Sequence, residues 1–238
     1  MTVTKKEEYI NKELTQLMQY WVSNVFLVAI ILFPFLGLLD YFVAPGKYLQ
    51  FFTYRVIVTL LVVGLYFLNK IRAAIRYQYI LVMIGLTLSA LTIQLMILSL
   101  GGHRSTYYAG LNLVVITVLG FVPLSVSMAL VGAVIVYFIY LFPILIVDQI
   151  TDVPQFIGNN LFMISTLIIT MMWRMFSQRR LLNELSLQYE LNIKNATLEN
   201  YSSSLEQEVT ARTKELRKSE QWHRHLYENA TDGIIQFL

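Results

Sequence analysis

The chain has no cysteine and unusually few charged residues. With no cysteine among 238 residues, disulfides, thiolate metal sites and cysteine nucleophiles are all excluded. Charged residues make up 14% of the chain, against about 25% in an ordinary soluble domain. Only ten of the 33 lie in the long central segment 21–178. This distribution excludes an ordinary water-soluble enzyme.

Positive charge is also too sparse for a protein that binds nucleic acid. The net charge is +3, and the lysines and arginines form no continuous basic stripe, so we predict no nucleic-acid partner. The sequence has no glycine-rich nucleotide loop, no paired carboxylates with a plausible cavity and no Ser/His/Asp arrangement. We therefore predict that this chain has no catalytic residues, binds no cofactor and is not itself an enzyme.

Long apolar runs dominate the sequence instead. Hydrophobic residues make up 56% of the chain, and the mean hydropathy is +0.58. A bilayer core about 30 Å thick requires about 20 apolar helical residues. Six runs approach that length: Trp21–Tyr41, Phe51–Asn69, Gln78–Leu100, Tyr107–Val122, Leu124–Val147 and Asn159–Phe176. We predict an all-α membrane protein, a six-transmembrane-helix bundle over residues 21–178, whose partner is the lipid bilayer.

The charges at the ends of the spans predict the orientation. Segment 1–20 is polar and is no cleavable signal peptide. Six spans place both termini on one side, which carries Lys5, Lys6, Lys12, Lys70, Arg72, Arg76, Arg179 and Arg180. The opposite side carries only Lys47 and Arg104. The positive-inside rule therefore predicts cytoplasmic termini and short outer loops at about 42–50, 101–106 and 148–158.

Polar residues gather near the predicted outer face. Asp40 ends the first span and Arg55 lies one turn into the second; an ionisable residue in a membrane is a functional candidate by default. The alternatives are that Arg55 extends to the interface or pairs with Asp40 for structure alone. Glycines beside His103 allow a tight turn, and its side chain could sense pH, bind a metal or simply be exposed.

The neighbouring tyrosines could contribute to a site or anchor the helix at the interface as part of an aromatic belt. Asp148 and Asp152 with a histidine could ligate a divalent ion, but no recognised ligand spacing is present, so we predict no metal site. The predicted ligand-binding residues are Asp40, Arg55, His103, Arg104, Tyr107, Tyr108, Asn112 and Asn159.

The composition changes after Phe176. Segment 177–224 contains no proline and no glycine, and its apolar residues approximate a heptad repeat. These residues, called the seam below, are Leu187, Leu191, Leu198, Tyr201, Leu205, Val209 and Leu216. A four–four spacing at Tyr201, Leu205 and Val209 is a stutter, which locally unwinds a coiled coil. We predict a parallel two-stranded coiled-coil linker over 179–221, and hence a homodimer; the alternative is a solvated amphipathic helix.

The last residues carry a resemblance. Leu226–Leu238, LYENATDGIIQFL, has a turn signal at Asp232-Gly233 followed by an apolar, strand-like run. Together with LEQEVTARTKELRKSE (Leu205–Glu220) before it, this segment resembles the linker and the opening helix and first strand of a PAS sensor domain. The resemblance implies a truncated PAS start at 222–238 and a chain that is a fragment of a longer receptor.

The membrane part carries a second resemblance. GGHRSTYYAGLNLV (Gly101–Val114), a short span closed by Pro123, and NNLFMISTLII (Asn159–Ile169) resemble the six-helix N-terminal membrane sensor module of bacterial sensor histidine kinases and adenylate or guanylate cyclases. This resemblance implies a dimeric receptor module in the bacterial cytoplasmic membrane that drives an output enzyme, a sensor histidine kinase or a nucleotide cyclase, through a helical stalk. Because polar and aromatic groups gather under such short outer loops, we predict that the module detects a small or hydrophobic ligand. A passive membrane anchor is the main alternative, and a transporter is a weaker one.

Overall fold

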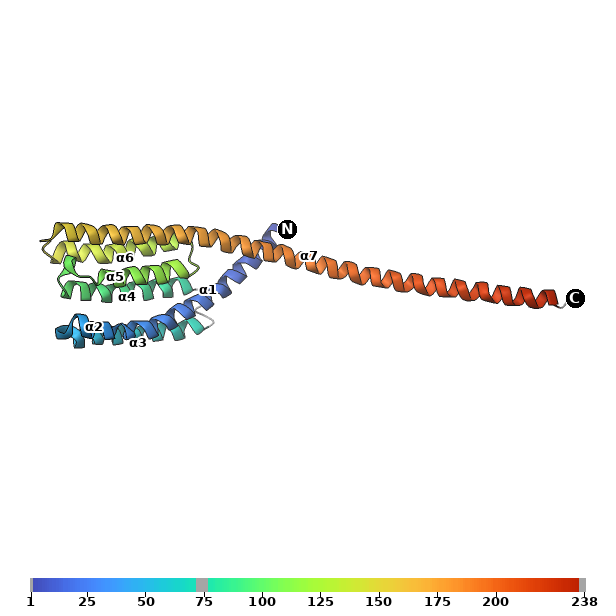
Figure 1. Cartoon of the computed structure of the whole chain (residues 1–238), viewed down its shortest axis with the longest axis horizontal. Helices are drawn as coiled ribbons and strands as arrows, with labels where there is room; N and C mark the ends of the chain where they lie inside the picture. The colour runs from blue at the N-terminus through green and yellow to red at the C-terminus, as the bar shows by residue number, and fades with distance from the viewer. Residues whose placement is uncertain (1, 72–76, 236–238) are drawn as a thin grey trace. The chain divides into compact units, whose positions relative to one another are not determined.

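The computed structural model describes residues 2–71 and 77–235, with side chains over 5–71 and 77–224. Its regular elements are α1 (Thr2–Phe35), α2 (Gly37–Val43), η1 (Pro45–Lys47), α3 (Tyr48–Lys70), α4 (Gln78–Ser99), η3 (Gly102–Arg104), α5 (Tyr108–Val115), the π-helix η4 (Ile116–Phe121), α6 (Val126–Val147) and α7 (Val153–Ile235) (Figure 1). Contacts divide the chain into two units, Met1–Leu185 and Ser186–Leu238.

The predicted spans are confirmed as helices. Five helical segments of the described chain are long and apolar enough to cross a bilayer, and a shorter apolar helix covers Tyr108–Phe121. This shorter helix is the fourth predicted span, the shortest of the six. The protein is therefore all-helical over its described residues, and its spans contact the lipid bilayer.

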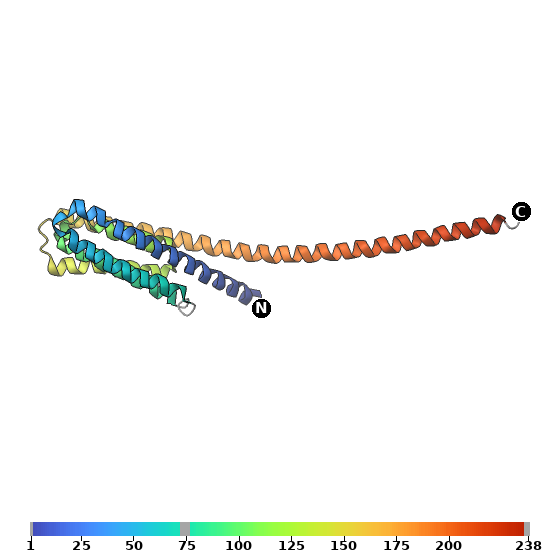
Figure 2. The ribbon, with the colours of Figure 1, turned by 90° about the horizontal axis from the view of Figure 1, so that it is seen from below.

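Helix α4 forms the centre of the first unit. It packs against α1, α3, α5 and α6, and 56% of its most apolar stretch is buried, against 17–28% in the other long helices. It carries no charged residue, and the small side chain of Ala90 is completely buried. Figure 2 shows the spans of this unit side by side. Lipid-facing positions on the surrounding helices stay exposed, as at Leu60.

Prolines lie within two spans and between two others. The predicted first span is divided at Leu36 into α1 and α2, and Pro34 lies inside α1, which continues through it to Phe35. This division places Asp40 on α2. Pro123 separates η4 from α6 as predicted, and Ser125 caps α6 by accepting a bond from the Met128 N–H. Pro143 lies inside α6, which remains helical to Val147.

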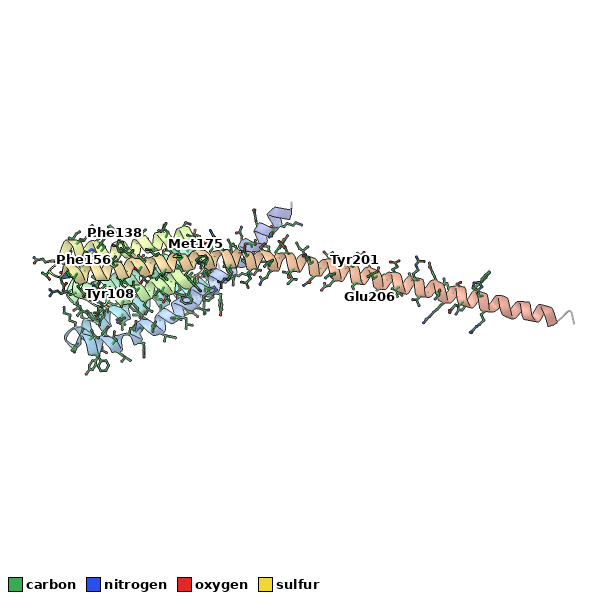
Figure 3. The ribbon with its side chains drawn as sticks, turned by 45° about the horizontal axis from the view of Figure 1, so that its top comes forward. Tyr108, Phe138, Phe156, Met175, Tyr201 and Glu206 are labelled. Carbon is green, nitrogen blue, oxygen red and sulfur yellow. The ribbon has the colours of Figure 1, made fainter. Side chains whose placement is uncertain are left out.

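The second unit consists of the C-terminal part of α7. The seam residues are 49–67% exposed in the single chain, and Figure 3 shows the side chains of Tyr201 and Glu206 along this segment. Because each seam side chain lacks cover within the unit, the predicted coiled coil requires a second chain and stays a prediction.

The predicted end of the chain differs from the structure. Helix α7 includes Asp232-Gly233 and extends to Ile235, so the predicted turn is absent and the strand does not begin at Ile234; residues 236–238 lie outside the described part. The physical reason is backbone pairing. A strand must find a partner for its N–H and C=O groups, whereas a helix pairs them locally, and the described residues form no strand. The PAS start is therefore not confirmed.

Candidate functional site

Three connections meet at one end of the first unit, which we call the loop end: Ala44–Lys47, Leu100–Tyr107 and Asp148–Asp152. Lys47 Nζ donates to the Ser99 carbonyl, Tyr107 bonds to Asp40, and His103 bonds to Asp148. The first bond joins the turn before α3 to the end of α4, and the other two join α2 and the residue after α6 to the connection before α5. Five of the eight candidate residues predicted from the sequence belong to two separate clusters near this end.

The first group is the ion-pair cluster, Asp40, Arg55 and Tyr107. Arg55 donates from Nε to Asp40 Oδ2 at 2.6 Å and from Nη2 to Oδ1 at 2.9 Å, which is the bidentate geometry that strengthens such pairs. The hydroxyl of Tyr107 donates to Asp40 Oδ1 at 2.9 Å. The side chains of Arg55 and Asp40 are only 5% and 0% exposed. Arg55 therefore pairs with Asp40 and does not extend to the interface.

Two further contacts fix the guanidinium of Arg55. Its Nη1 donates to the Phe33 carbonyl at 3.2 Å, a group near the end of α1 made accessible by the break at Leu36. Its Cζ lies 5.1 Å from the centre of the Phe33 ring, within cation–π range. The ion-pair cluster thus joins α1, α2, α3 and the turn before α5.

The second group is the His103 cluster. The backbone N–H and ring Nδ1 of His103 both lie 2.7 Å from Asp148 Oδ2, and the Asp152 N–H donates to ring Nε2 at 3.2 Å. Asn159 Nδ2 donates to the His103 carbonyl at 2.8 Å, and its Oδ1 accepts from Gln155 Nε2. Asp152 also caps the start of α7, because its carboxylate accepts from the Gln155 N–H.

These bonds define the charge and tautomer of His103. Since Nε2 accepts a backbone N–H, it carries no proton, and the proton sits on Nδ1, where it is donated to Asp148. Both nitrogens of this buried ring (2% exposed) are thereby occupied. Among the described residues no group of three acidic or histidine side chains is placed to hold a metal ion. The His103 cluster holds the loop end together.

The contacts with His103 change the pKa of the Asp148 carboxyl group. Burial alone would raise the pKa of its carboxyl group, but the hydrogen bonds from the backbone and ring of His103, together with a bond from the Gln149 N–H, lower the pKa below its usual value. Asp148 therefore stays ionised and is the acceptor that positions the glycine-rich turn.

Gly102 provides a matched test of this contact. Gly101 and Gly102 both have positive φ, +91° and +55°, but an added Cβ at Gly102 would lie 1.9 Å from Asp148 Oδ2, whereas one at Gly101 meets nothing within 4 Å. Both alanine variants incur about 1–2 kcal/mol of backbone strain. We expect Gly102→Ala to lose about 1–3 kcal/mol more, because it displaces the carboxylate from His103. Unfolding in mild detergent measures the difference, and equal losses would contradict it.

The remaining predicted residues occupy different environments. Arg104 is exposed. Tyr108 is half-buried, and its ring meets Phe162 of α7 edge-on at 5.9 Å; Figure 3 shows Tyr108 toward the loop end. Asn112 is buried, and neither atom of its amide has a hydrogen-bond partner. None of these three bonds to either cluster.

An apolar pocket of about 310 Å³ opens beside the ion-pair cluster. Its walls come from α1, α2, α4, α5 and η4, and Arg55 and Tyr107 form part of its lining. The other lining residues are Val25, Val28, Ala29, Leu32, Phe33, Leu36, Leu39, Val43, Ser89, Ile93, Thr106, Ala109, Gly110, Leu113, Val114, Thr117 and Val118. Val28, Leu39 and Leu113 are exposed, so the pocket borders the lipid. Sequence reasoning missed these residues because apolar pocket walls and lipid-facing positions have the same composition.

Arg174 is a second residue that sequence reasoning did not assign to a role. It lies on α7, is 2% exposed, and donates from Nη1 to the Val122 carbonyl at 3.1 Å. Its Nε has no partner. Four residues on, Gln178 Oε1 accepts the Val126 N–H at 2.8 Å. Together, Arg174 and Gln178 hold α7 against the turn that joins η4 to α6. The only sequence signal was a lone arginine in the last span.

The fold and these polar clusters define a class, a multi-span helical membrane domain with a polar loop end and a lipid-bordering pocket. Comparison with family models places the chain more narrowly. The model of the MASE8 family matches residues 38–192, so the chain belongs to the MASE8 family, a membrane-associated sensory domain. The matched segment includes every predicted site residue. No curated protein and no solved structure matches the chain.

Proposed function

We propose that this domain is the sensory input of a bacterial receptor that binds a small hydrophobic ligand in the pocket beside Arg55. The observation that carries the proposal is the position of this pocket. Its lining includes Arg55 and Tyr107, two of the residues that the sequence predicts to bind a ligand, within a mostly apolar wall. Pockets for small molecules commonly combine an apolar lining with a few convergent polar groups.

The predicted orientation supports a signal from outside. The loop end carries few positive charges, and by the positive-inside rule this supports a loop end outside the cytoplasmic membrane with both termini in the cytoplasm. The connections at the loop end are short, so the helices themselves must detect the ligand. Segments 179–221 and 222–238 would then lead to a cytoplasmic PAS domain and an output enzyme, a histidine kinase or a nucleotide cyclase.

A continuous set of contacts supports transmission from the pocket to α7. Thr117 and Val118 line the pocket at the end of the α5–η4 wall away from Tyr107, and both belong to the π-helix η4. Turns of π-helix occur frequently at functional sites. The next residue after η4, Val122, accepts the bond from Arg174. A ligand acts only if it binds one arrangement of this region better than another. We propose that η4 and the Arg174–Val122 contact adopt two arrangements, and that the ligand binds one of them better than the other.

The exposed seam supports a dimer. Seven large apolar side chains at heptad spacing lack cover in the single chain, and a parallel second copy would bury them as a coiled coil. Because the chain contains no cysteine, single cysteines report this pairing directly. We expect Leu205→Cys to cross-link readily in native membranes, whereas Ser203→Cys, outside the seam, cross-links poorly.

The same cross-link tests the sensory function without a known ligand. Val114→Trp fills the pocket, and Leu60→Trp adds the same ring on a lipid-facing surface outside it. If the pocket controls the linker, Val114→Trp changes the Leu205→Cys cross-linking rate about fivefold or more, the lower range of allosteric coupling, and Leu60→Trp does not. A passive anchor gives the same rate in both variants. No cross-link at Leu205 under any condition would eliminate the dimeric mechanism.

A further inference from the structure

The size, charge and hydrogen-bonding groups of the pocket indicate which class of small hydrophobic ligand it binds. This inference rests on the sensory function proposed above. The pocket volume of about 310 Å³ lies at the small end of ligand sites in proteins. From Tyr107 to Val118 the lining follows α5 and η4 for about 16 Å at 1.5 Å per residue. A site of this length and small volume suits a single extended chain.

The charge at the polar end selects against ions. Asp40 and Arg55 form a bidentate pair that carries no net charge. An anionic group at Arg55 would face a guanidinium whose charge Asp40 already neutralises, and a cationic group would meet that guanidinium directly. Because an unpaired charge in a low-dielectric site is strongly unfavourable, the bound molecule must be neutral.

The hydrogen-bonding capacity of Arg55 defines the head group. A guanidinium has five N–H donors, and three of them are used, two by Asp40 and one by the Phe33 carbonyl. Two donors remain on a residue that lines the pocket. The Tyr107 hydroxyl gives its proton to Asp40. The two remaining Arg55 donors at the polar end are matched by an acceptor on the ligand.

We propose that the pocket binds a neutral, single-chain lipophilic molecule with a hydrogen-bond acceptor, such as an ester carbonyl, at one end. The acceptor receives an N–H from Arg55, and the chain lies along α5 and η4 toward Val118. Exposed lining residues, including Leu39 and Leu113, border the lipid, so the ligand enters from the bilayer. A bilayer phospholipid does not fit this description, since it has two chains and a charged phosphate.

Native mass spectrometry of the full chain in mild detergent tests the proposal with four single-chain probes. Methyl decanoate is neutral with an acceptor, decanoate is anionic, decyltrimethylammonium is cationic, and undecane has no acceptor. We expect one methyl decanoate per chain, bound about tenfold or more tightly than each other probe, because a hydrogen bond to a charged donor contributes at least that factor. Equal or tighter binding of decanoate, decyltrimethylammonium or undecane, or retention of phospholipid alone, would overturn it.

Two sets of variants locate the binding. Val114→Trp should abolish binding of methyl decanoate, and Leu60→Trp should leave it unchanged. The double variant Asp40→Asn/Arg55→Met removes the polar end without leaving a lone charge. In this double variant the preference for methyl decanoate over undecane should fall to within about twofold. Undiminished preference there would show that Arg55 does not hold the acceptor.

This experiment separates the ligand class from the sensory function. If Val114→Trp alters linker cross-linking but methyl decanoate shows no preference, the ligand class is wrong and the sensory function stands. If methyl decanoate binds as expected but filling the pocket leaves the linker unchanged, the pocket is a lipid-binding site without a signalling role.

Discussion

Asp40→Asn is expected to destabilise the protein by about 3–5 kcal/mol, the usual consequence of removing one partner of a buried ion pair. The variant keeps the shape of the side chain but leaves the Arg55 charge, 5% exposed, without a counter-charge in a region where water is scarce. Tyr107→Phe, which removes only one hydrogen bond to the Asp40 carboxylate, should cost less, about 1.5–3 kcal/mol. Thermal or denaturant unfolding in the same detergent measures both.

The double variant shows whether the loss reflects an orphaned charge. Asp40→Asn/Arg55→Met should recover most of the stability, because an apolar replacement removes the unpaired cation. A double-mutant cycle then gives a large coupling between positions 40 and 55. If Asp40→Asn alone costs less than about 1 kcal/mol, water reaches the pair, and the argument for a neutral ligand fails with it.

Arg174→Met is expected to leave the unfolding free energy nearly unchanged and to weaken the coupling between the pocket and the linker. Arg174 makes one hydrogen bond to a neutral carbonyl, and its Nε is unpaired, so the bond offsets little of the cost of burying its charge. An apolar side chain of similar length should change the unfolding free energy by no more than about 1 kcal/mol in either direction. Nevertheless, it removes the contact between α7 and the residue after η4.

The uncoupling is measured with the same cross-link at Leu205. In the Arg174→Met background, we expect the effect of Val114→Trp on the cross-linking rate to fall from about fivefold to within about twofold. Arg174→Lys keeps a charged donor within reach of Val122 and serves as the control. Full coupling in Arg174→Met would mean that the signal reaches α7 by another route, and a large loss of stability would assign Arg174 a structural role.

The sequence predicted those parts of the molecule that depend on hydropathy and local geometry. The spans followed from the lengths of apolar runs, and Pro123 correctly ended the fourth of them. The pairing of Asp40 with Arg55 was one of the alternatives, since charges at adjacent span ends have few other partners. The turn at Asp232-Gly233 failed because a local turn signal does not supply the partner strand that a PAS start needs.

Other features depend on packing that no local pattern encodes. The site residues divide into two clusters because the Asp152 N–H and Asp148 carboxylate occupy both ring nitrogens of His103, and this follows only from how the loops meet. The lining of the pocket was invisible because Val114 and its neighbours have the composition of any lipid-facing surface. Arg174 was visible as a charge, but its partner is a backbone carbonyl, which carries no sequence signal.

The neutrality of the Asp40–Arg55 pair also determines how the domain responds to the transmembrane voltage. One elementary charge that crosses a membrane at 100 mV changes its energy by about 2.3 kcal/mol. Asp40 and Arg55 move together as zero net charge, so among the buried charges described within the spans, Arg174 contributes the net charge. A displacement of Arg174 through a tenth of the bilayer would change its energy by about 0.2 kcal/mol. The switch that we propose would therefore respond to a ligand in the bilayer almost independently of the membrane voltage.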